Sequence, residues 1–326
     1  MEESELLAGL NKVAERSVAE WGLSGDLRLI KHRENAVYEL NTGKSRYALR
    51  VHRQDYHSDA ALASELLWMR ALQNAGVGVP ESVPADDGRD FVRVGVPELP
   101  GEFQVDMLGW IEGEQIGDIE TGLGEGAAEC FRTIGQVAAQ MHNQASSWQL
   151  PDGFVRHAWD VDGLVGAEPF WGKFWELRAL TDEELKLIHE AREKVAADLE
   201  AFGKSAEDYS MIHSDFVPEN FLLHGSQVQV IDFDDAGFGW HLFDLATALF
   251  FIKEDPSFNT AKGALIDGYR EFRELPDEKL DQLPLFTTAR SFTYLSWLHT
   301  REETELTRAM TPAIVDMCCA ACEDYL

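Results

Sequence analysis

The pattern of apolar residues changes once along the chain, near residue 110, and this change limits the possible folds more than any other feature. Before it, five short runs are strand-like: Leu27–Arg33, Ala36–Leu40, Tyr47–His52, Phe91–Val96 and Phe103–Leu108. Polar or glycine-containing connections separate them, as in an antiparallel meander. Residues 59–75 interrupt the series with the apolar spacing of a helix. The first third therefore predicts a five-stranded antiparallel sheet with one inserted helix.

After residue 126 the pattern becomes mainly helical. Six segments have helical apolar spacing: 126–145, 183–202, 239–252, 260–273, 278–299 and 305–324. A further helix is expected over residues 5–21, and the segment 108–116 is the natural boundary between the strand-rich and helical parts. We therefore predict an α+β fold with a small N-terminal lobe over residues 1–108 and a larger, mainly helical lobe over residues 109–326.

The chain is strongly acidic, with 58 Asp and Glu residues against 28 Lys and Arg residues and a formal net charge of −30. Such a surface repels nucleic-acid phosphates and anionic lipids, because binding to either depends on basic residues that release counterions. No apolar run approaches the roughly 18–20 residues of a membrane-spanning helix, and the acidic N-terminus lacks the pattern of a signal peptide. We expect no nucleic-acid partner, no membrane partner and a cytoplasmic location.

The most informative segment lies in the last third of the chain. It contains His213, Asp215 and Asn220, followed by an apolar run, a turn and a strand that ends in Asp232. Phosphoryl transfer requires a carboxylate that accepts the proton of the attacking hydroxyl, and oxygen ligands that hold Mg²⁺ against the phosphates. Asp215 suits the first role, and Asn220 and Asp232 suit the second. A short hairpin between Asn220 and Asp232 would bring these two residues together at one end.

The spacing His-x-Asp-x₄-Asn, followed by Ile231-Asp232-Phe233, resembles the aminoglycoside phosphotransferase and choline kinase superfamily. The resemblance continues through Asp235-Ala236-Gly237 and Asp244-Leu245-Ala246. Within the superfamily, the chain is similar to the branch that contains homoserine-kinase-like proteins and bacterial stress-response kinases of the RdoA type. This resemblance implies a protein-kinase-like two-lobed fold. It also implies transfer of the γ-phosphate of ATP, with Mg²⁺, to a hydroxyl group.

The resemblance also implies roles for individual residues of this segment. Asp215 would be the catalytic base, and Asn220 and Asp232 would be the Mg²⁺ ligands. Asp244 would brace the catalytic loop. His213 would hold the same loop by hydrogen bonding rather than take part in the chemistry.

In the N-terminal lobe the resemblance rests on weaker motifs. It places the phosphate-binding basic residue at Arg50, on the third strand, with Glu65 of the inserted helix as its ion-pair partner. Most kinases have lysine there, and arginine keeps the charge on a wider planar group. The loop between the first two strands lacks the glycines of a protein kinase, so Asn35 is expected either to contact the nucleotide or to have an ordinary role in the turn. Backbone groups of one short stretch would bind adenine: Met107, Leu108 and Trp110.

The sequence favours a small molecule as phosphate acceptor. Asp244 follows Asp232 by only 12 positions, which leaves little room for the activation segment on which protein kinases bind peptides. An aromatic-rich segment over residues 154–175 falls where this family often places its acceptor pocket. Its aromatic faces would hold a cationic amine by cation–π attraction, assisted by Asp160 and Asp162. Alternatively, these aromatic residues belong to the core.

Other functions stay open at this point. A Ser/Thr protein kinase of the RdoA type has the same overall pattern, and a non-catalytic ATP-binding regulator would bind Mg-ATP without turnover. A metal-dependent hydrolase built on His213 and Asp215 would need further ligands, for which His224 and His241 are the candidates. Three further points stay open: whether the acceptor is an amino alcohol, a homoserine-like or an aminoglycoside-like compound; whether GTP replaces ATP; and the oligomeric state.

Overall fold

The computed structural model describes residues 3–33, 35–115, 126–225 and 227–326. The chain forms two compact units. Unit 1 comprises Met1–Glu114, Leu150–Val155 and Leu222–Ile231, and unit 2 comprises Gln115–Gln149, Arg156–Phe221 and Asp232–Leu326. Unit 1 contains the predicted sheet, and unit 2 contains most of the predicted helices.

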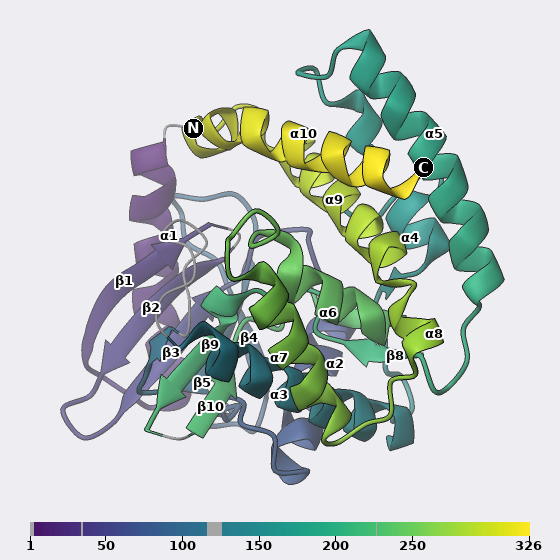
Figure 1. Cartoon of the computed structure of the whole chain (residues 1–326). Helices are drawn as coiled ribbons and strands as arrows, with labels where there is room; N and C mark the ends of the chain where they lie inside the picture. The colour runs from purple at the N-terminus through teal and green to yellow at the C-terminus, as the bar shows by residue number, and fades with distance from the viewer. Residues whose placement is uncertain (1–2, 34, 116–125, 226) are drawn as a thin grey trace. The chain divides into compact units, whose positions relative to one another are not determined.

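Unit 1 is built on a five-stranded sheet, as predicted (Figure 1). Its strands are β1 (Asp26–His32), β2 (Ala36–Asn41), β3 (Arg46–Val51), β4 (Phe91–Val94) and β5 (Phe103–Gly109). They lie in the order β1-β2-β3-β5-β4, and all neighbouring pairs are antiparallel. Each strand begins and ends within two residues of its predicted bounds, because polar or glycine-containing connections mark the turns.

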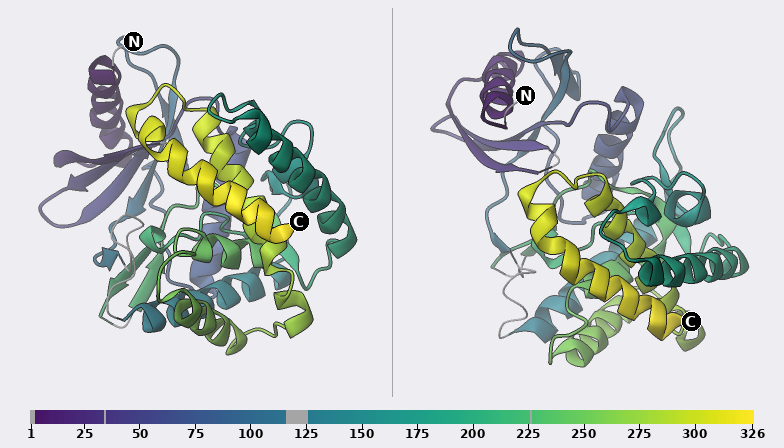
Figure 2. Two further views of the ribbon diagram at one scale, coloured as in Figure 1. Left: turned by 45° about the horizontal axis from the view of Figure 1, so that its top comes forward. Right: turned by 90° about the horizontal axis from the view of Figure 1, so that it is seen from above.

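Two helices accompany this sheet. α1 (Glu3–Ser17) continues as a 3₁₀ turn, η1 (Val18–Trp21), and stops at Gly22, whose φ of 59° suits a residue without a Cβ atom. α1 packs against β1, β3, β4 and β5 and covers one face of the sheet (Figure 2). α2 (Asp59–Asn74) is the predicted inserted helix. It begins at Ser58, whose hydroxyl accepts a backbone N–H of the first turn.

A hairpin stands between the two candidate metal ligands. β9 (Phe221–His224) and β10 (Gln227–Val230) are neighbours in a small sheet whose third strand is β6 (Glu114–Gln115). β9 starts directly after Asn220, and β10 ends two residues before Asp232. The predicted hairpin is therefore confirmed, and it places Asn220 and Asp232 at its same end, where the chain enters and leaves.

Unit 2 is mainly helical. Its helices are α3 (Ala127–Ser147), α4 (Val161–Val165), α5 (Asp182–Phe202), α6 (His241–Phe250), α7 (Phe258–Arg270), α8 (Asp277–Leu280), α9 (Leu283–His299) and α10 (Glu305–Tyr325), with 3₁₀ turns η2 (Phe174–Glu176) and η3 (Pro218–Asn220). A small sheet joins β11 (Gly237–Trp240), β8 (Tyr209–Ile212) and β7 (Ala158–Trp159). α9 is buried along most of its length and packs against α6 and α10 (Figure 2). No helix in the described ranges is both long and apolar enough to cross a bilayer.

One predicted helix is divided in two. The apolar spacing predicts a single helix over residues 278–299, but α8 ends at Leu280 and α9 begins at Leu283. Pro284, in the first turn of α9, accounts for the break. Proline lacks a backbone N–H and its ring collides with the preceding turn, so it is unfavourable inside a helix and favoured in the first turn.

α3 and α7 cross closely because glycines stand at the contact. A Cβ atom at Gly135 of α3 would lie 2.0 Å from the backbone oxygen of Leu265, and one at Gly268 of α7 would meet the backbone of α3 equally closely. A larger residue at either position would push the helices apart. The close crossing brings His142 of α3 within hydrogen-bonding distance of Tyr269 of α7.

Candidate active site

One buried carboxylate holds the predicted catalytic loop, which follows β8. Asp244 Oδ2 accepts the His213 N–H at 3.1 Å, and Asp244 Oδ1 accepts the Ser214 N–H at 2.7 Å. Ser214 has a φ of 65°, a left-handed conformation that is unfavourable for a residue with a Cβ atom. Burial raises the pKa of Asp244 to about 6, so the carboxyl is ionised at neutral pH. Asp244 therefore braces the strained turn that precedes Asp215.

A buried network lies behind Asp244. His142 Nε2 is 3.0 Å from Asp244 Oδ2, and His142 Nδ1 is 3.0 Å from the Tyr269 hydroxyl. Burial, together with the charge of Arg273, lowers the pKa of His142 well below its ordinary value, so the ring is neutral. Burial raises the pKa of Tyr269, so its hydroxyl keeps the proton. It follows that Tyr269 donates to Nδ1 and that the Nε2–H group of His142 donates to Asp244.

His213 lies in the core of unit 2. Its side chain is fully buried, with its ring centroid 4.7 Å from that of Phe233 and 5.5 Å from that of Phe216. Its backbone N–H is bound by Asp244. An imidazole packed against two aromatic rings in the core is not exposed to a substrate. A direct chemical role for His213 finds no support in this placement, and its role in holding the loop stays a prediction.

Asp215 presents a carboxylate whose two oxygens have different partners. Oδ1 accepts a hydrogen bond from Arg290 Nη2 at 2.8 Å, and Oδ2 accepts one from Asn220 Nδ2 at 2.9 Å. The side chain is 25% exposed, so a hydroxyl group can approach it. A carboxylate that is fixed from two sides and open to solvent suits the predicted role of catalytic base.

The two candidate metal ligands differ in exposure. Asn220 is buried, and its Nδ2 group donates to Oδ2 and to the backbone oxygen of Asp215. Both bonds use the amide nitrogen, whereas a metal would use Oδ1 of the same group. Asp232 is exposed and has a φ of 68°, a strained conformation of a kind that is frequent at functional sites. Together the two residues offer the oxygen ligands that Mg²⁺ prefers.

Arg290 was not among the residues predicted from the sequence. This residue lies in the middle of α9, 75 positions after Asp215, and its side chain is fully buried. Its Nη2 atom donates to Asp215 and, at 2.8 Å, to the Tyr294 hydroxyl. A basic residue inside an apolar helix is the only local signal, because the contact with Asp215 forms through the tertiary fold.

Asp235, three residues after Asp232, is fixed beside the catalytic loop. Its backbone oxygen accepts hydrogen bonds from Ser214 Oγ at 2.6 Å and from Trp159 Nε1 at 2.8 Å. Its Oδ1 atom accepts one from Trp171 Nε1 at 3.2 Å. Asp235 and Trp171 are both half-buried. The aromatic segment therefore supplies one partly exposed ring next to a carboxylate of the candidate site.

The other residues expected in the acceptor pocket differ in their surroundings. Trp159 and Phe174 are fully buried in the core. Asp160 caps the N-terminus of α4 and forms an ion pair with Lys204 at 2.6 Å. Asp162 is exposed on α4. Core residues were the alternative interpretation of these aromatics, and it holds for Trp159 and Phe174.

In unit 1, Arg50 forms the expected ion pair with Glu65, at 2.9 Å. Arg50 also donates to Asp106 of β5, from Nε to Oδ1 at 2.9 Å and from Nη2 to Oδ2 at 2.5 Å. His52 Nε2 lies 3.1 Å from the same Oδ2 atom. All four side chains are buried. Burial opposes the ionisation of Asp106, but Arg50 and His52 outweigh it and lower the pKa of the carboxyl below its ordinary value.

Asp106 was also missed from the sequence, where an acidic residue in the mainly apolar run of β5 was the available signal. Two carboxylates, from Asp106 and Glu65, surround the single guanidinium of Arg50. Their combined negative charge weakens the attraction of Arg50 for an anion. The phosphate contact of Arg50 stays a prediction, and these two carboxylates count against it.

Asn35 has a partner within the turn. Its Oδ1 atom accepts the backbone N–H of Arg53 at 3.0 Å, which links the connection between β1 and β2 to the end of β3. This is the ordinary turn role that sequence analysis left open. The preceding Glu34 lies outside the described residues, and a nucleotide contact by Asn35 stays a prediction.

The stretch expected to bind adenine belongs to the end of β5 and the residues after it. Met107 and Leu108 are buried, and the Trp110 ring lies 4.3 Å below the guanidinium carbon of Arg46. The Met107 carbonyl already accepts the Val83 N–H at 2.8 Å, and the Trp110 N–H already donates to the Arg46 carbonyl at 3.2 Å. Adenine would therefore have to use other backbone groups of this stretch, and its placement there stays a prediction.

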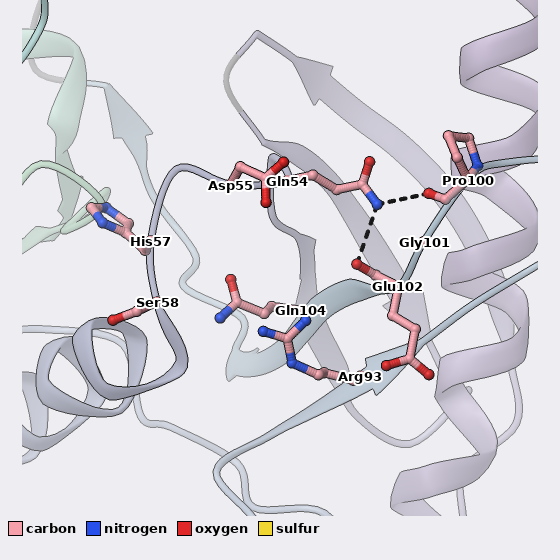
Figure 3. Close-up of a pocket in the computed structure, with 9 residues that line it drawn as sticks. All are labelled: Gln54, Asp55, His57, Ser58, Arg93, Pro100, Gly101, Glu102 and Gln104. Carbon is pink, nitrogen blue, oxygen red and sulfur yellow. Dashed lines mark hydrogen bonds between the residues drawn. The ribbon is translucent and has the colours of Figure 1, made fainter.

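A polar cavity of about 720 Å³ lies in unit 1 (Figure 3). Nine residues line it: Gln54, Asp55, His57, Ser58, Arg93, Pro100, Gly101, Glu102 and Gln104. Gln54 Nε2 donates to the Pro100 carbonyl at 2.8 Å and to the Glu102 carbonyl at 3.3 Å. The cavity contains none of the predicted site residues, so its size is no reason to place the chemistry there.

Known proteins provide an independent comparison. The model of the phosphotransferase enzyme family (APH) matches residues 26–275 of the chain. This match spans the five-stranded sheet, the catalytic loop and Asp232. The chain belongs to the phosphotransferase enzyme family. The predicted enzyme class, a phosphotransferase with an alcohol group as acceptor, is thereby confirmed.

Three relatives show the range of similarity within this family. A microcompartment-associated aminopropanol kinase of known structure is 32% identical, with 97% of each chain covered and a TM-score of 0.86. A homoserine kinase from Paramagnetospirillum magneticum (strain AMB-1) is 33% identical over 82% of this chain and 79% of its own. The amicoumacin kinase hAmiN, in complex with AMP-PNP, Ca²⁺ and Ami, is 20% identical over 98% and 96% of the two chains, with a TM-score of 0.78. The predicted protein-kinase-like α+β fold is therefore confirmed.

Proposed function

We propose that this protein transfers the γ-phosphoryl group of ATP, with Mg²⁺, to the hydroxyl group of a small amino alcohol. The observation that carries the proposal is the 32% identity to an aminopropanol kinase over 97% of both chains, which extends far beyond the catalytic motif. The hAmiN complex supports a nucleotide and a divalent cation as ligands of this fold.

Asn220 and Asp232 are the residues proposed to hold Mg²⁺. Both offer oxygen atoms at one end of the β9–β10 hairpin, and oxygen is the ligand that Mg²⁺ prefers, so the donor set fits the metal. When bound, Mg²⁺ would neutralise negative charge on the phosphates. The hydrogen bond from Asn220 Nδ2 to Asp215 Oδ2 holds the proposed metal ligand next to the proposed base.

Asp215 is proposed to orient the acceptor hydroxyl and to take its proton. The acceptor oxygen forms a bond to the γ-phosphorus, the bond between that phosphorus and the bridging oxygen of ADP breaks, and the proton passes to the Asp215 carboxylate. Arg290 and Asn220 hold the two carboxylate oxygens, and the 25% exposure of the side chain leaves a path for the acceptor.

Asp235 and Trp171 are proposed to bind the amino group of the acceptor. An amino alcohol is positively charged at neutral pH, so its ammonium group gains a charge-assisted hydrogen bond to Asp235 and cation–π attraction to Trp171. Both side chains are partly exposed and are joined by a hydrogen bond. Asp235 is also fixed to the catalytic loop through Ser214, which precedes Asp215.

Homoserine is a second candidate acceptor, favoured by the 33% identity to a homoserine kinase. It has the same ammonium group and hydroxyl, but it also has a carboxylate. This carboxylate would approach a region that contains Asp215, Asp232 and Asp235, where its negative charge is repelled. We therefore rank the amino alcohol ahead of homoserine as the acceptor.

A coupled ADP-release assay with Mg-ATP tests the proposal. The acceptor panel contains 1-amino-2-propanol, ethanolamine, choline, homoserine and 1,2-propanediol, plus a generic protein substrate. We expect turnover to be fastest with an amino alcohol, to require Mg²⁺, and to disappear in the Asp215→Asn variant. Faster turnover with homoserine would select the second candidate. Labelling of the protein substrate alone would select a protein kinase, and thermal stabilisation by Mg-ATP without turnover would indicate a regulator.

A further inference from the structure

We propose that Arg290 is a positioning residue for Asp215, retained for the reaction and not for the stability of the fold. The inference rests on the proposed function, because it gives Arg290 a part in the same phosphoryl transfer. Its starting point is the hydrogen bond from Arg290 Nη2 to Asp215 Oδ1, at 2.8 Å.

The surroundings of Arg290 do not suit a charged group. Its side chain is fully buried, and the guanidinium carbon faces the rings of Tyr294 at 4.3 Å, Trp171 at 5.5 Å and Phe243 at 5.7 Å. Its Nε and Nη1 atoms are buried and have no hydrogen-bond partner among the described residues. Aromatic faces offset only part of the loss of hydration of a guanidinium.

A residue in this position contributes little to the stability of unit 2. Buried N–H groups without partners are unfavourable, and apolar side chains of similar volume often replace a buried ion pair without loss of stability. Asp215 is 25% exposed, so water can solvate its carboxylate when the arginine is absent. A Met side chain at position 290 would fill the same aromatic surroundings without buried polar groups. Stability alone therefore does not account for Arg290.

The contact with Asp215 provides the alternative reason. Asn220 holds Oδ2 of Asp215 and Arg290 holds Oδ1, so the carboxylate plane is fixed from two sides. Removal of Arg290 would free the carboxylate to rotate about its terminal bond, and a base misplaced by about 1 Å slows a reaction by up to about 10²-fold. The Arg290 charge also stands beside Asp235, the proposed amine ligand.

Tyr294 completes the arrangement around Arg290. Burial raises the pKa of Tyr294, so its hydroxyl stays protonated and accepts the second hydrogen bond of Nη2 at 2.8 Å. Tyr294 lies one helical turn after Arg290 on α9. The hydroxyl thus fixes the direction from which Nη2 approaches Asp215.

The experiment compares Arg290→Met, Arg290→Lys and wild-type full-length protein with Mg-ATP and the best acceptor. It measures kcat, the KM for ATP, the KM for the acceptor and the thermal unfolding midpoint. For Arg290→Met we expect kcat to fall about 10- to 100-fold, the KM for ATP to stay within about threefold, and the unfolding midpoint to stay equal or to rise. Arg290→Lys keeps the charge and should recover part of kcat.

Two results would overturn the inference while the wild type is active. An Arg290→Met protein with a kcat within about threefold of the wild type would show that Asp215 needs no such partner. An Arg290→Met protein that unfolds, or whose unfolding midpoint falls in parallel with activity, would show a structural role. A wild type without turnover on any acceptor would overturn the proposed function, and the role of Arg290 with it.

Discussion

The amide nitrogen of Asn220 joins two atoms of Asp215, the backbone oxygen at 2.8 Å and Oδ2 at 2.9 Å. One side chain therefore contacts the proposed base through its nitrogen and offers its oxygen to the proposed metal. As a result, the position of the proposed base depends on a residue that is also proposed to bind the metal. Loss of Asn220 should impair both functions, whereas loss of the Asp215 charge should impair only one.

We predict that Asp215→Asn lowers kcat by about 10²- to 10⁴-fold with little change in ATP affinity, because only the proton acceptor is lost.

Asn220→Ala should lower kcat and also weaken the binding of Mg-ATP relative to metal-free ATP. Raised Mg²⁺ should restore the binding but not kcat, since Oδ2 of the base still lacks its Asn220 partner. Steady-state kinetics and nucleotide titrations check this, with the exposed Asn259→Ala as control. Equal weakening of metal-free and Mg-bound ATP by Asn220→Ala would contradict the metal-ligand role.

Asp244 should make activity and stability depend on pH in opposite directions. Burial raises the pKa of Asp244 to about 6, above the ordinary value of about 3.9. Below about pH 6 the carboxyl takes up a proton and loses acceptor capacity for the His213 and Ser214 N–H groups, so kcat should fall. Because its pKa is raised, the folded protein holds the Asp244 proton more tightly than the unfolded chain does. This adds on the order of 3 kcal/mol to the free energy of unfolding at low pH, and the contribution disappears as the pH rises from about 4 to 6.

The Asp244→Asn variant tests this pH dependence, because asparagine does not titrate. Chemical unfolding from pH 4 to pH 7 should show a smaller loss of stability in the variant than in the wild type. The variant should also have low kcat at every pH, since one of the two loop N–H groups loses its acceptor. Parallel stability curves for the two proteins would argue against a raised pKa of Asp244.

The fold was predictable from the sequence because its signals are local. Strand bounds follow from apolar runs between polar turns, and the hairpin before Asp232 follows from its short length. The helix over residues 278–299 was predicted too long, because apolar spacing continues across the break and only Pro284 marks it. A proline at a helix start and one inside a helix look alike when periodicity alone is read.

The candidate site was predictable where its residues are close together in the chain, as with Asp215, Asn220 and Asp232. Arg290 and Asp106 were missed because each acts through a contact more than 50 positions away, at 75 and 56 positions. Acceptor binding at residues 154–175 stays a prediction, and the sequence pointed to Asp160 and Asp162 as its acidic residues but not to Asp235. Asp160 is a helix cap with a short-range partner, whereas Asp235 meets Trp171 only through the tertiary fold.

Asp106 should be essential to the stability of unit 1. Its carboxyl is buried and bonded to Arg50 and His52, so Asp106→Asn removes one of the two carboxylates described beside the guanidinium, the other being that of Glu65. We predict a loss of about 3 kcal/mol in the free energy of unfolding. The pKa of Asp106 is lowered, so this stabilisation is present at neutral pH and is lost as the pH falls below about 4.

A surface pair in the same unit provides the control for Asp106. Glu98 pairs with Lys12, and both side chains are at least 40% exposed. Glu98→Gln should therefore cost far less stability than Asp106→Asn, because water and salt screen exposed ion pairs. Denaturant unfolding of both variants gives the comparison. Similar losses for Asp106→Asn and Glu98→Gln would mean that the buried cluster contributes no more than a surface pair.

Asp235 should determine whether the acceptor amine is recognised. Asp235→Asn keeps the shape of the side chain and its hydrogen bond from Trp171 but removes the charge that attracts an ammonium group. We predict that kcat/KM for 1-amino-2-propanol falls about 10- to 100-fold, in keeping with the loss of a hydrogen bond to a charged group. The value for 1,2-propanediol, which has no amine, should change by less than about threefold.

Asp162→Asn is the matched control for this prediction, because Asp162 is an exposed aspartate of α4 in the segment that sequence analysis favoured. It should leave both acceptors unaffected. The ratio of kcat/KM for the amine to that for the diol separates recognition from general damage to the site. If Asp235→Asn slows both acceptors equally, Asp235 supports the catalytic loop and does not bind the amine. If Asp162→Asn changes the ratio instead, the amine lies beside α4, as the sequence first indicated.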